Sequence, residues 1–408
     1  MIIDYFEVQH MDVGMQLLAN ELGSGREPPL FLLSDIAYFI LKSPRVKSKE
    51  SIKKHWLTCK KGYDILVDVL YYFGSSVYLH FWEDLYLGRS HRLTMQQRLQ
   101  RGGGDIHNEE ERGKMEEIVK LFEEYSDFWN LMDAVLKSGD ALEEKCRLLI
   151  ADFLVKFLQT DLLERKDVSK DVRKSLFLKT MHIDSMNTYR MFDQYIEVIT
   201  NQLPFEDPQH LQIAENLLNM FITASCYDAV INQNELVNQM ADIYKKLDND
   251  QCRQLLEMIK YPTFTINMLD EVLSTADMSN VAKEHRFYAD MRHVPLQLEK
   301  LFEYVLKITP STVRSINDIY RHVLDVSYYV INVLSTISIH GYRKTGETPL
   351  ALTDDQVTYL KTRGPIVIEK WESLVEKQIK LYTTPSTKNT KQKIRWSVKA
   401  TKLTVLNL

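Results

Sequence analysis

Residues 313–334, VRSINDIYRHVLDVSYYVINVL, carry the pattern that decides the fold. Apolar side chains recur there at intervals of three and four residues: Val313, Ile316, Ile319, Tyr320, Val323, Leu324 and, further on, Leu334. This spacing places them on one face of an α-helix, because a helix completes a turn every 3.6 residues. The stretch therefore predicts a long helix with one side packed against a hydrophobic core.

The same apolar spacing recurs along most of the chain. It is found in residues 115–136, 211–222, 236–247 and 298–306, and we expect a last helix over about 355–380. The links between these segments are short. We expect Asp248-Asn249-Asp250 to cap a helix, and Pro262, Pro295 and Pro310 to lie near helix starts. The fold class that follows is all-α, with antiparallel helix neighbours.

Helix spacing also bears on how the helices are arranged. From Ile183 to Leu306 the expected helices recur roughly every 16–22 residues, so a pair spans about 35–45 residues. This spacing resembles HEAT and armadillo repeats, which implies an irregular helical-repeat array similar to an α-solenoid. Irregular packing of a compact helical domain predicts the same spacing and remains the alternative.

Changes in composition suggest four regions. They are an N-terminal helical block (1–99), a Gly- and Glu-rich flexible loop (100–113), a helical-repeat-like body (114–382) and a basic C-terminal arm (383–408). The N-terminus has no basic, apolar signal sequence, and no apolar run reaches the ~18 residues that span a bilayer. We therefore expect a nuclear or cytoplasmic protein that is not secreted and has no membrane span.

The C-terminal arm contains a segment with a different period. In residues 393–400 apolar and polar side chains alternate, which is typical of a β-strand. A strand at the end of a helical chain needs a pairing partner, either in its own chain or in another. We therefore expect a β-like segment that binds a protein partner, with the contact residues Ile394, Arg395, Trp396, Val398 and Lys399.

Charge is distributed unevenly along the chain. The formal net charge is −5, yet residues 377–408 hold eight basic residues and no acid, and residues 42–61 hold eight basic residues and one acid. Such segments could contact a polyanion. The candidate residues are Lys47, Lys49, Lys53, Lys54, Lys60, Lys61, Lys391 and Lys393. For residues 47–61 we favour a simpler interpretation, a solvated helix face whose apolar side holds Ile52, His55, Trp56 and Cys59.

An acidic segment lies between these two basic ones. Residues 105–144 contain thirteen acidic and four basic residues. They could bind a basic partner or the chain's own C-terminal arm, but such runs are more often solvated.

Signals for catalysis or cofactor binding are not found. The sequence contains no GxxxxGK[ST], GxGxxG, HExxH or GxSxG motif. Glycine is scarce: 14 of 408 residues is about 3.4%, against the usual ~7%. This scarcity disfavours Gly-rich nucleotide-binding enzymes. The four cysteines are widely spaced and form no CxxC pair, so we expect buried thiols and neither a metal nor a cofactor.

These observations favour a non-enzymatic helical scaffold or adaptor, a subunit of a larger complex that binds protein partners. One alternative is a nucleic-acid- or chromosome-associated factor that uses segments 42–61 and 377–402. A second is a helical enzyme whose site has no recognisable motif. A viral nucleocapsid-like protein is a further, smaller alternative, because such proteins are also helical with terminal arms.

Overall fold

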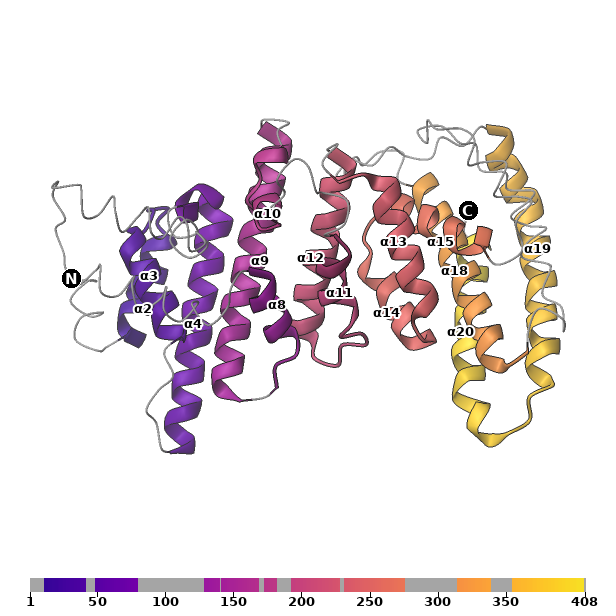
Figure 1. Cartoon of the computed structure of the whole chain (residues 1–408), viewed down its shortest axis with the longest axis horizontal. Coiled ribbons are helices and arrows are strands. Elements are labelled where there is room, and N and C mark those ends of the chain that lie inside the picture. Colours follow the sequence, from indigo (N-terminus) through magenta and orange to yellow (C-terminus); the bar gives the residue numbers. More distant parts are fainter. Residues whose placement is uncertain are drawn as a thin grey trace. The chain divides into compact units, whose positions relative to one another are not determined.

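The computed structural model confirms that the fold is all-α (Figure 1). It describes residues 11–41, 48–79, 128–139, 141–168, 172–181, 192–227, 231–275, 314–338 and 354–406. Within these ranges every regular element is an α-helix or a short 3-10 helix. None of the described helices has both the length and the apolar character needed to cross a bilayer.

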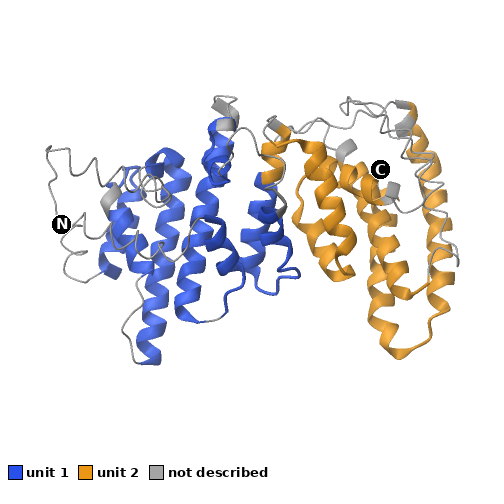
Figure 2. Cartoon of the chain, viewed as in Figure 1, with its two compact units in different colours: residues 1–220 blue, residues 221–408 orange. Residues whose placement is uncertain are grey.

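The chain divides into two compact units (Figure 2). Unit 1 is Met1–Met220 and unit 2 is Phe221–Leu408, so the division falls inside helix α12 (Pro208–Tyr227). The expected loop at 100–113 and its two boundaries lie outside the described residues. The expected boundary at 382/383 falls at the turn between α19 and α20, inside unit 2.

Unit 1 is organised around α9, a long helix that packs against α3, α4, α8 and α10. Every residue from 148 to 155 is buried, so α9 is covered on all sides over two turns. Tyr78 packs edge-on against Phe153 with ring centroids 4.9 Å apart. The elements are α2 (Met11–Leu22), α3 (Leu30–Leu41), α4 (Lys49–Phe73), η1 (Ser75–Tyr78), α8 (Phe128–Leu136), α9 (Leu142–Val168), η2 (Val172–Lys174), α10 (Leu176–Lys179), α11 (Phe192–Thr200) and the first part of α12.

Unit 2 is organised around α18 (Ile316–Ser338), the helix predicted from residues 313–334. The apolar stripe is buried as expected from Ile316 to Leu334, whereas Val313 lies outside the described residues. Helices α14, α15, α19 and α20 pack against α18. The elements of the unit are the end of α12, α13 (Gln233–Lys246), α14 (Asn249–Met258), α15 (Pro262–Thr275), α18, α19 (Asp354–Lys380), η5 (Pro385–Thr387) and α20 (Lys388–Leu406). The expected helical segment at 298–306 lies outside the described residues.

Local signals set several of these helix ends. Asp248 caps α14 as predicted: its side chain accepts hydrogen bonds from the backbone N–H groups of Asp250 and Gln251, and the Gln251 side chain accepts one from the Asp248 N–H. Pro262 is the first residue of α15, where a missing N–H costs nothing. The expected helix at 355–380 is α19. Pro295 and Pro310 lie outside the described residues.

The predicted β-like segment is wrong, because residues 388–406 form the helix α20. Its buried residues are Ile394, Val398, Thr401 and Val405, spaced four, three and four residues apart, which is a helical period. The expected strand face included Trp396, yet this side chain is 71% exposed. The alternation in residues 393–400 was misleading, because Ile394 and Val398 lie on one face of the segment whether it forms a strand or a helix.

The basic C-terminal residues are also not a separate arm. Helix α20 packs against α18 and α19 within unit 2, and its buried stripe belongs to the core of that unit. Removing it would uncover the apolar face of α18.

The buried and exposed faces of α20 can be tested by a matched pair of substitutions. We expect Ile394→Ala to lower the free energy of unfolding of unit 2 by about 2–4 kcal/mol, because it removes a fully buried side chain. Trp396→Ala should change it by less than about 0.5 kcal/mol, because that side chain is exposed. Urea denaturation followed by circular dichroism measures both. Equal losses would contradict the helix, since only a strand puts the two residues on one face.

A buried polar network ties α13 to α18 in the same unit. The Tyr244 hydroxyl donates a hydrogen bond to the carboxylate of Asp325. Arg321 donates to the backbone carbonyls of Tyr244, at 3.2 Å, and Leu247, and so satisfies the end of α13. Burial raises the pKa of Asp325 to about 7, because the desolvated carboxylate is disfavoured more than its hydrogen bond from Tyr244 and the charge of Arg321 favour it.

This raised pKa predicts a pH-dependent stability. An unfolded aspartate has a pKa of ~3.9, so the folded state binds the proton more tightly, and stability falls as pH rises from about 4 to 7. Asp325→Asn keeps a hydrogen-bond acceptor for Tyr244 but cannot ionise. The quantity to compare is the free energy of unfolding of the variant minus that of the wild type. We expect this difference to be more positive at pH 8 than at pH 4.5, by on the order of 1–3 kcal/mol. Urea denaturation at the two pH values measures this difference; an equal effect at both would show that Asp325 does not titrate in this range.

Candidate functional site

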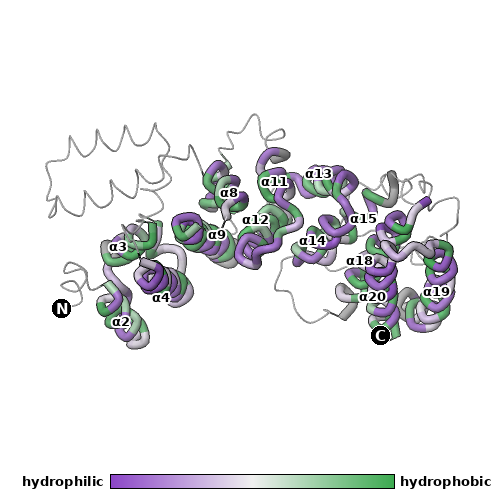
Figure 3. The backbone as a smooth tube through the Cα atoms, turned by 90° about the horizontal axis from the view of Figure 1, so that it is seen from below, coloured by the Kyte–Doolittle hydropathy of each residue, from purple (hydrophilic) through white to green (hydrophobic). Residues whose placement is uncertain are grey.

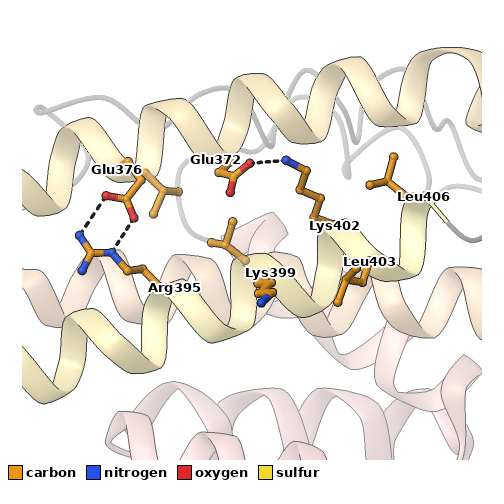
Figure 4. Close-up of a pocket in the computed structure, with 9 residues that line it drawn as sticks. Glu372, Glu376, Arg395, Lys399, Lys402, Leu403 and Leu406 are labelled. Atoms are coloured by element: carbon orange, nitrogen blue, oxygen red, sulfur yellow. Dashed lines mark hydrogen bonds and ion pairs between the residues drawn. The ribbon is translucent and has the colours of Figure 1, made fainter.

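A groove of about 390 Å³ lies between α19 and α20 (Figure 4). Helix α19 supplies one wall and α20 the other. The lining residues are Glu372, Val375, Glu376, Arg395, Val398, Lys399, Lys402, Leu403 and Leu406. The groove therefore combines apolar side chains with charges of both signs.

The rotation of each helix about its axis places these side chains. Helix α19 buries Trp371, Val375 and Ile379, which are spaced four residues apart, so Glu372 and Glu376 turn towards α20. Helix α20 buries its own stripe and leaves Leu403 and Leu406 each 51% exposed. Figure 4 shows these two leucines at one end of the groove.

Two ion pairs bridge the walls of the groove. The Arg395 guanidinium donates two hydrogen bonds to the Glu376 carboxylate, at 2.7 and 3.1 Å, and the Lys402 ammonium lies 2.8 Å from Glu372. The hydrogen bonds from Arg395 lower the pKa of Glu376. These pairs hold α20 in register with α19 but, because their side chains are partly exposed to water, add little stability.

Only part of the positive charge of α20 is neutralised by acids. The helix contains six basic residues and no acid. Arg395 and Lys402 pair with α19, and Lys393 pairs with Asp250 of α14 at 2.5 Å. The other three make no ion pair with the described residues: Lys388, Lys391 and Lys399. Of these three lysines, Lys399 lines the groove.

The predicted partner-binding residues separate into two groups. Ile394 and Val398 are buried in the core of unit 2, and Arg395 is paired with Glu376. Trp396 and Lys399 are exposed on α20; Lys399 lines the groove, whereas Trp396 lies outside its lining. Leu403 and Leu406 were not predicted from the sequence, because the alternating pattern stops before them. A helical period starting from Trp396 would have indicated Leu403, since a residue seven positions on lies only about 20° away around the axis, whereas Leu406, ten positions on, lies about 80° away.

The lysines predicted to contact a polyanion lie in two places. Lys49, Lys53, Lys54, Lys60 and Lys61 are all exposed on α4, whereas Lys391 and Lys393 belong to α20 in unit 2. Lys47 lies outside the described residues.

The first turns of α4 have no buried side. Every residue from 48 to 54 is exposed, and in Figure 1 this end extends past the ends of α3 and α9. Viewed from below, it has the purple of hydrophilic residues (Figure 3). Of the apolar side expected for this segment, Cys59 is buried, His55 and Trp56 are half-buried and Ile52 is exposed. The apolar face therefore starts one turn later than expected.

One group of side chains in the described residues has the composition of a metal site. His55 and Cys59 of α4 meet Cys146 of α9, with the three candidate ligand atoms within 4.8 Å of one another. Our expectation of no metal site rested on the wide spacing of the cysteines. The packing of α4 on α9 brings together two cysteines that are 87 residues apart.

The resemblance to HEAT and armadillo repeats concerns helix spacing and does not identify a ligand. Comparison of the chain with protein-family models, with curated proteins and with solved structures finds no match in any of the three.

Proposed function

We propose that this chain is a non-enzymatic helical scaffold or adaptor that binds a protein partner at the α19–α20 groove. The observation that carries the proposal is the exposed face of α20, where Leu403, Leu406 and the unpaired Lys399 line the groove. Trp396 is exposed on the same helix, outside the groove lining. The partner segment that fits is an amphipathic helix with acidic side chains.

Physical chemistry supports this kind of partner. Exposed tryptophan and leucine lose unfavourable contact with water when a partner covers them, and tryptophan is enriched among residues that dominate binding energy. A helix laid in a groove between two helices is a common recognition mode. The unpaired lysines of α20 would attract acidic side chains and repel basic ones, which adds specificity and speeds association.

The scaffold proposal includes a repeat-like arrangement of helices within each unit. Its support is that helices near in sequence pack together: α3 with α4, α8 with α9, α13 with α15, and α19 with α20. In helical-repeat proteins such packing gives a rigid surface for partners.

A pair of Leu→Glu substitutions tests the docking surface. Leu403 lines the groove and is 51% exposed, whereas Leu163 of α9 is 40% exposed in unit 1. Proteins that bind the tagged full chain are identified by affinity purification, and the affinity of each is measured by calorimetry with the wild type and both variants. We expect Leu403→Glu to weaken the partner's binding at least about 10-fold, and Leu163→Glu to leave it unchanged.

Charge reversal provides a second measurement on the same surface. Lys399→Glu should weaken the partner's binding and reduce its dependence on salt, because an attractive contact becomes repulsive. The proposal fails if the partner binds Leu403→Glu and Lys399→Glu as tightly as the wild type. It also fails if Leu163→Glu weakens binding as much as Leu403→Glu does.

The alternative function, binding of nucleic acid, is favoured by one observation, the exposed lysines of α4. Lys60 also lies over the ring of Trp56, 6.0 Å from its centroid, so a cation and an aromatic ring are presented together. The basic residues of α20 favour this function less, because three of the six are paired with acids.

Salt dependence distinguishes nucleic-acid binding from protein docking. If α4 contacts a DNA backbone, log Kd should change linearly with log salt, and Lys53→Glu with Lys54→Glu should reduce that slope by about 2. Fluorescence anisotropy with labelled double-stranded DNA and single-stranded RNA measures the slope. Lys388→Glu on α20 is the control and should leave it unchanged. No binding of either nucleic acid at low salt would exclude this alternative.

A further inference from the structure

Three side chains with metal-binding atoms converge inside unit 1, on helices that the groove does not involve. His55 and Cys59 are one turn apart on α4, and Cys146 lies near the start of α9. The His55 Nε2 atom lies 3.3 Å from the Cys59 sulfur, and the two sulfurs are 3.9 Å apart. The three atoms therefore face one common point.

The helices hold this arrangement in place. Residues four apart share one face of a helix, and that face of α4 packs on α9. Cys59 and Cys146 are buried. His55 is half-buried, and its ring centroid lies 4.9 Å from that of Phe39 on α3. The thiols are thus in the interior, while the imidazole lies where an ion from solvent can reach it.

The distances match those between ligands of a tetrahedral zinc ion. With Zn–S bonds of ~2.3 Å and Zn–N bonds of ~2.0–2.1 Å, tetrahedral angles put two sulfurs about 3.8 Å apart and sulfur and nitrogen about 3.5 Å apart. The Sγ–Sγ separation and the separation of Cys59 Sγ from His55 Nε2 agree within about 0.3 Å, and all three atoms lie within 4.8 Å of one another. A disulfide would need the sulfurs at about 2.05 Å, so both are free thiols here.

Charge balance also favours a divalent ion at this point. Two thiolates, a neutral imidazole and Zn²⁺ together have no net charge, which a buried site tolerates.

We propose that His55, Cys59 and Cys146 bind a zinc ion, with water as the fourth ligand, and that the ion fastens α4 to α9. Zinc forms bonds to the two sulfurs and to Nε2, and the protons of any protonated thiols leave to solvent. Side chains from two helices are then joined through one atom, so metal binding stabilises the packing of α4 on α9.

Cobalt provides the test, because Co²⁺ bound by thiolates in a tetrahedral site absorbs strongly in the visible range. The full-length protein is purified without oxygen, freed of metal and titrated with Co²⁺, then with Zn²⁺. We expect one Co²⁺ per chain with a thiolate charge-transfer band, displaced by Zn²⁺. Cys59→Ser and Cys146→Ser should each weaken Co²⁺ binding at least about 100-fold.

Two further variants control for folding and for general thiol binding. Cys226→Ser, on α12 in unit 2, removes a half-buried thiol outside the cluster and should leave the affinity unchanged within about 2-fold. His55→Ala alters a half-buried residue and should weaken binding at least about 10-fold while circular dichroism stays that of the wild type. If a buried Cys→Ser variant fails to fold, the affinity of His55→Ala for Co²⁺ shows whether the cluster binds metal.

Several outcomes would overturn the proposal. One is a folded wild-type chain that takes up neither Co²⁺ nor Zn²⁺ at micromolar concentration. A second is a cobalt spectrum that survives Cys59→Ser or Cys146→Ser, or is lost in Cys226→Ser. A third is protein purified in air with a Cys59–Cys146 disulfide by mass spectrometry whose reduced form binds no metal, which would identify a redox-active pair instead.

Discussion

The packing of α20 on α18 determines which surface the C-terminal part of the chain presents. Burying an isoleucine or valine stabilises a fold by about 1.5–3 kcal/mol each, so Ile394, Val398 and Val405 together fix the rotation of α20. Trp396 is two residues from both Ile394 and Val398, which places it ~160–200° away around the axis. The largest apolar side chain of α20 is therefore exposed because three smaller ones are buried. The basic and apolar face of the groove follows from that rotation.

The sequence predicted well what depends on local spacing. Helices α13, α18 and α19 follow from apolar periodicity, and the start of α14 follows from Asp248, because hydrogen bonds within a few residues decide these features. Helix α20 was not predictable in this way. Over residues 393–400 alternation and helical spacing both bury Ile394 and Val398, and the choice depends on α18, which lies more than 50 residues earlier in the chain.

Contacts between distant segments also decide which charged side chains and cysteines lie together, and local sequence does not reveal these contacts. Counting charges identified the basic segments but could not show that Glu372, Glu376 and Asp250 neutralise half of the cations of α20. These acids lie outside the acidic run at 105–144, which was considered as a partner of the C-terminal residues but was expected to be solvated. Cys59 and Cys146 show no local signal either, since only the packing of α4 on α9 brings them together. Exposed lysines remain on α4, so the case for polyanion binding moves from the C-terminus to this helix.

The exposed, lysine-bearing turns of α4 and the proposed metal ligands on the same helix are physically connected. Residues 48–54 bury no side chain, so nothing in the described core holds the first two turns against fraying. Just after these turns, His55 contacts Phe39 of α3 and Cys59 contacts Cys146 of α9. A metal ion at that point would anchor the helix where the exposed lysine-bearing turns begin. Its loss would loosen Lys49, Lys53 and Lys54 before it disturbed the core around α9, because α9 is buried on all sides over residues 148–155.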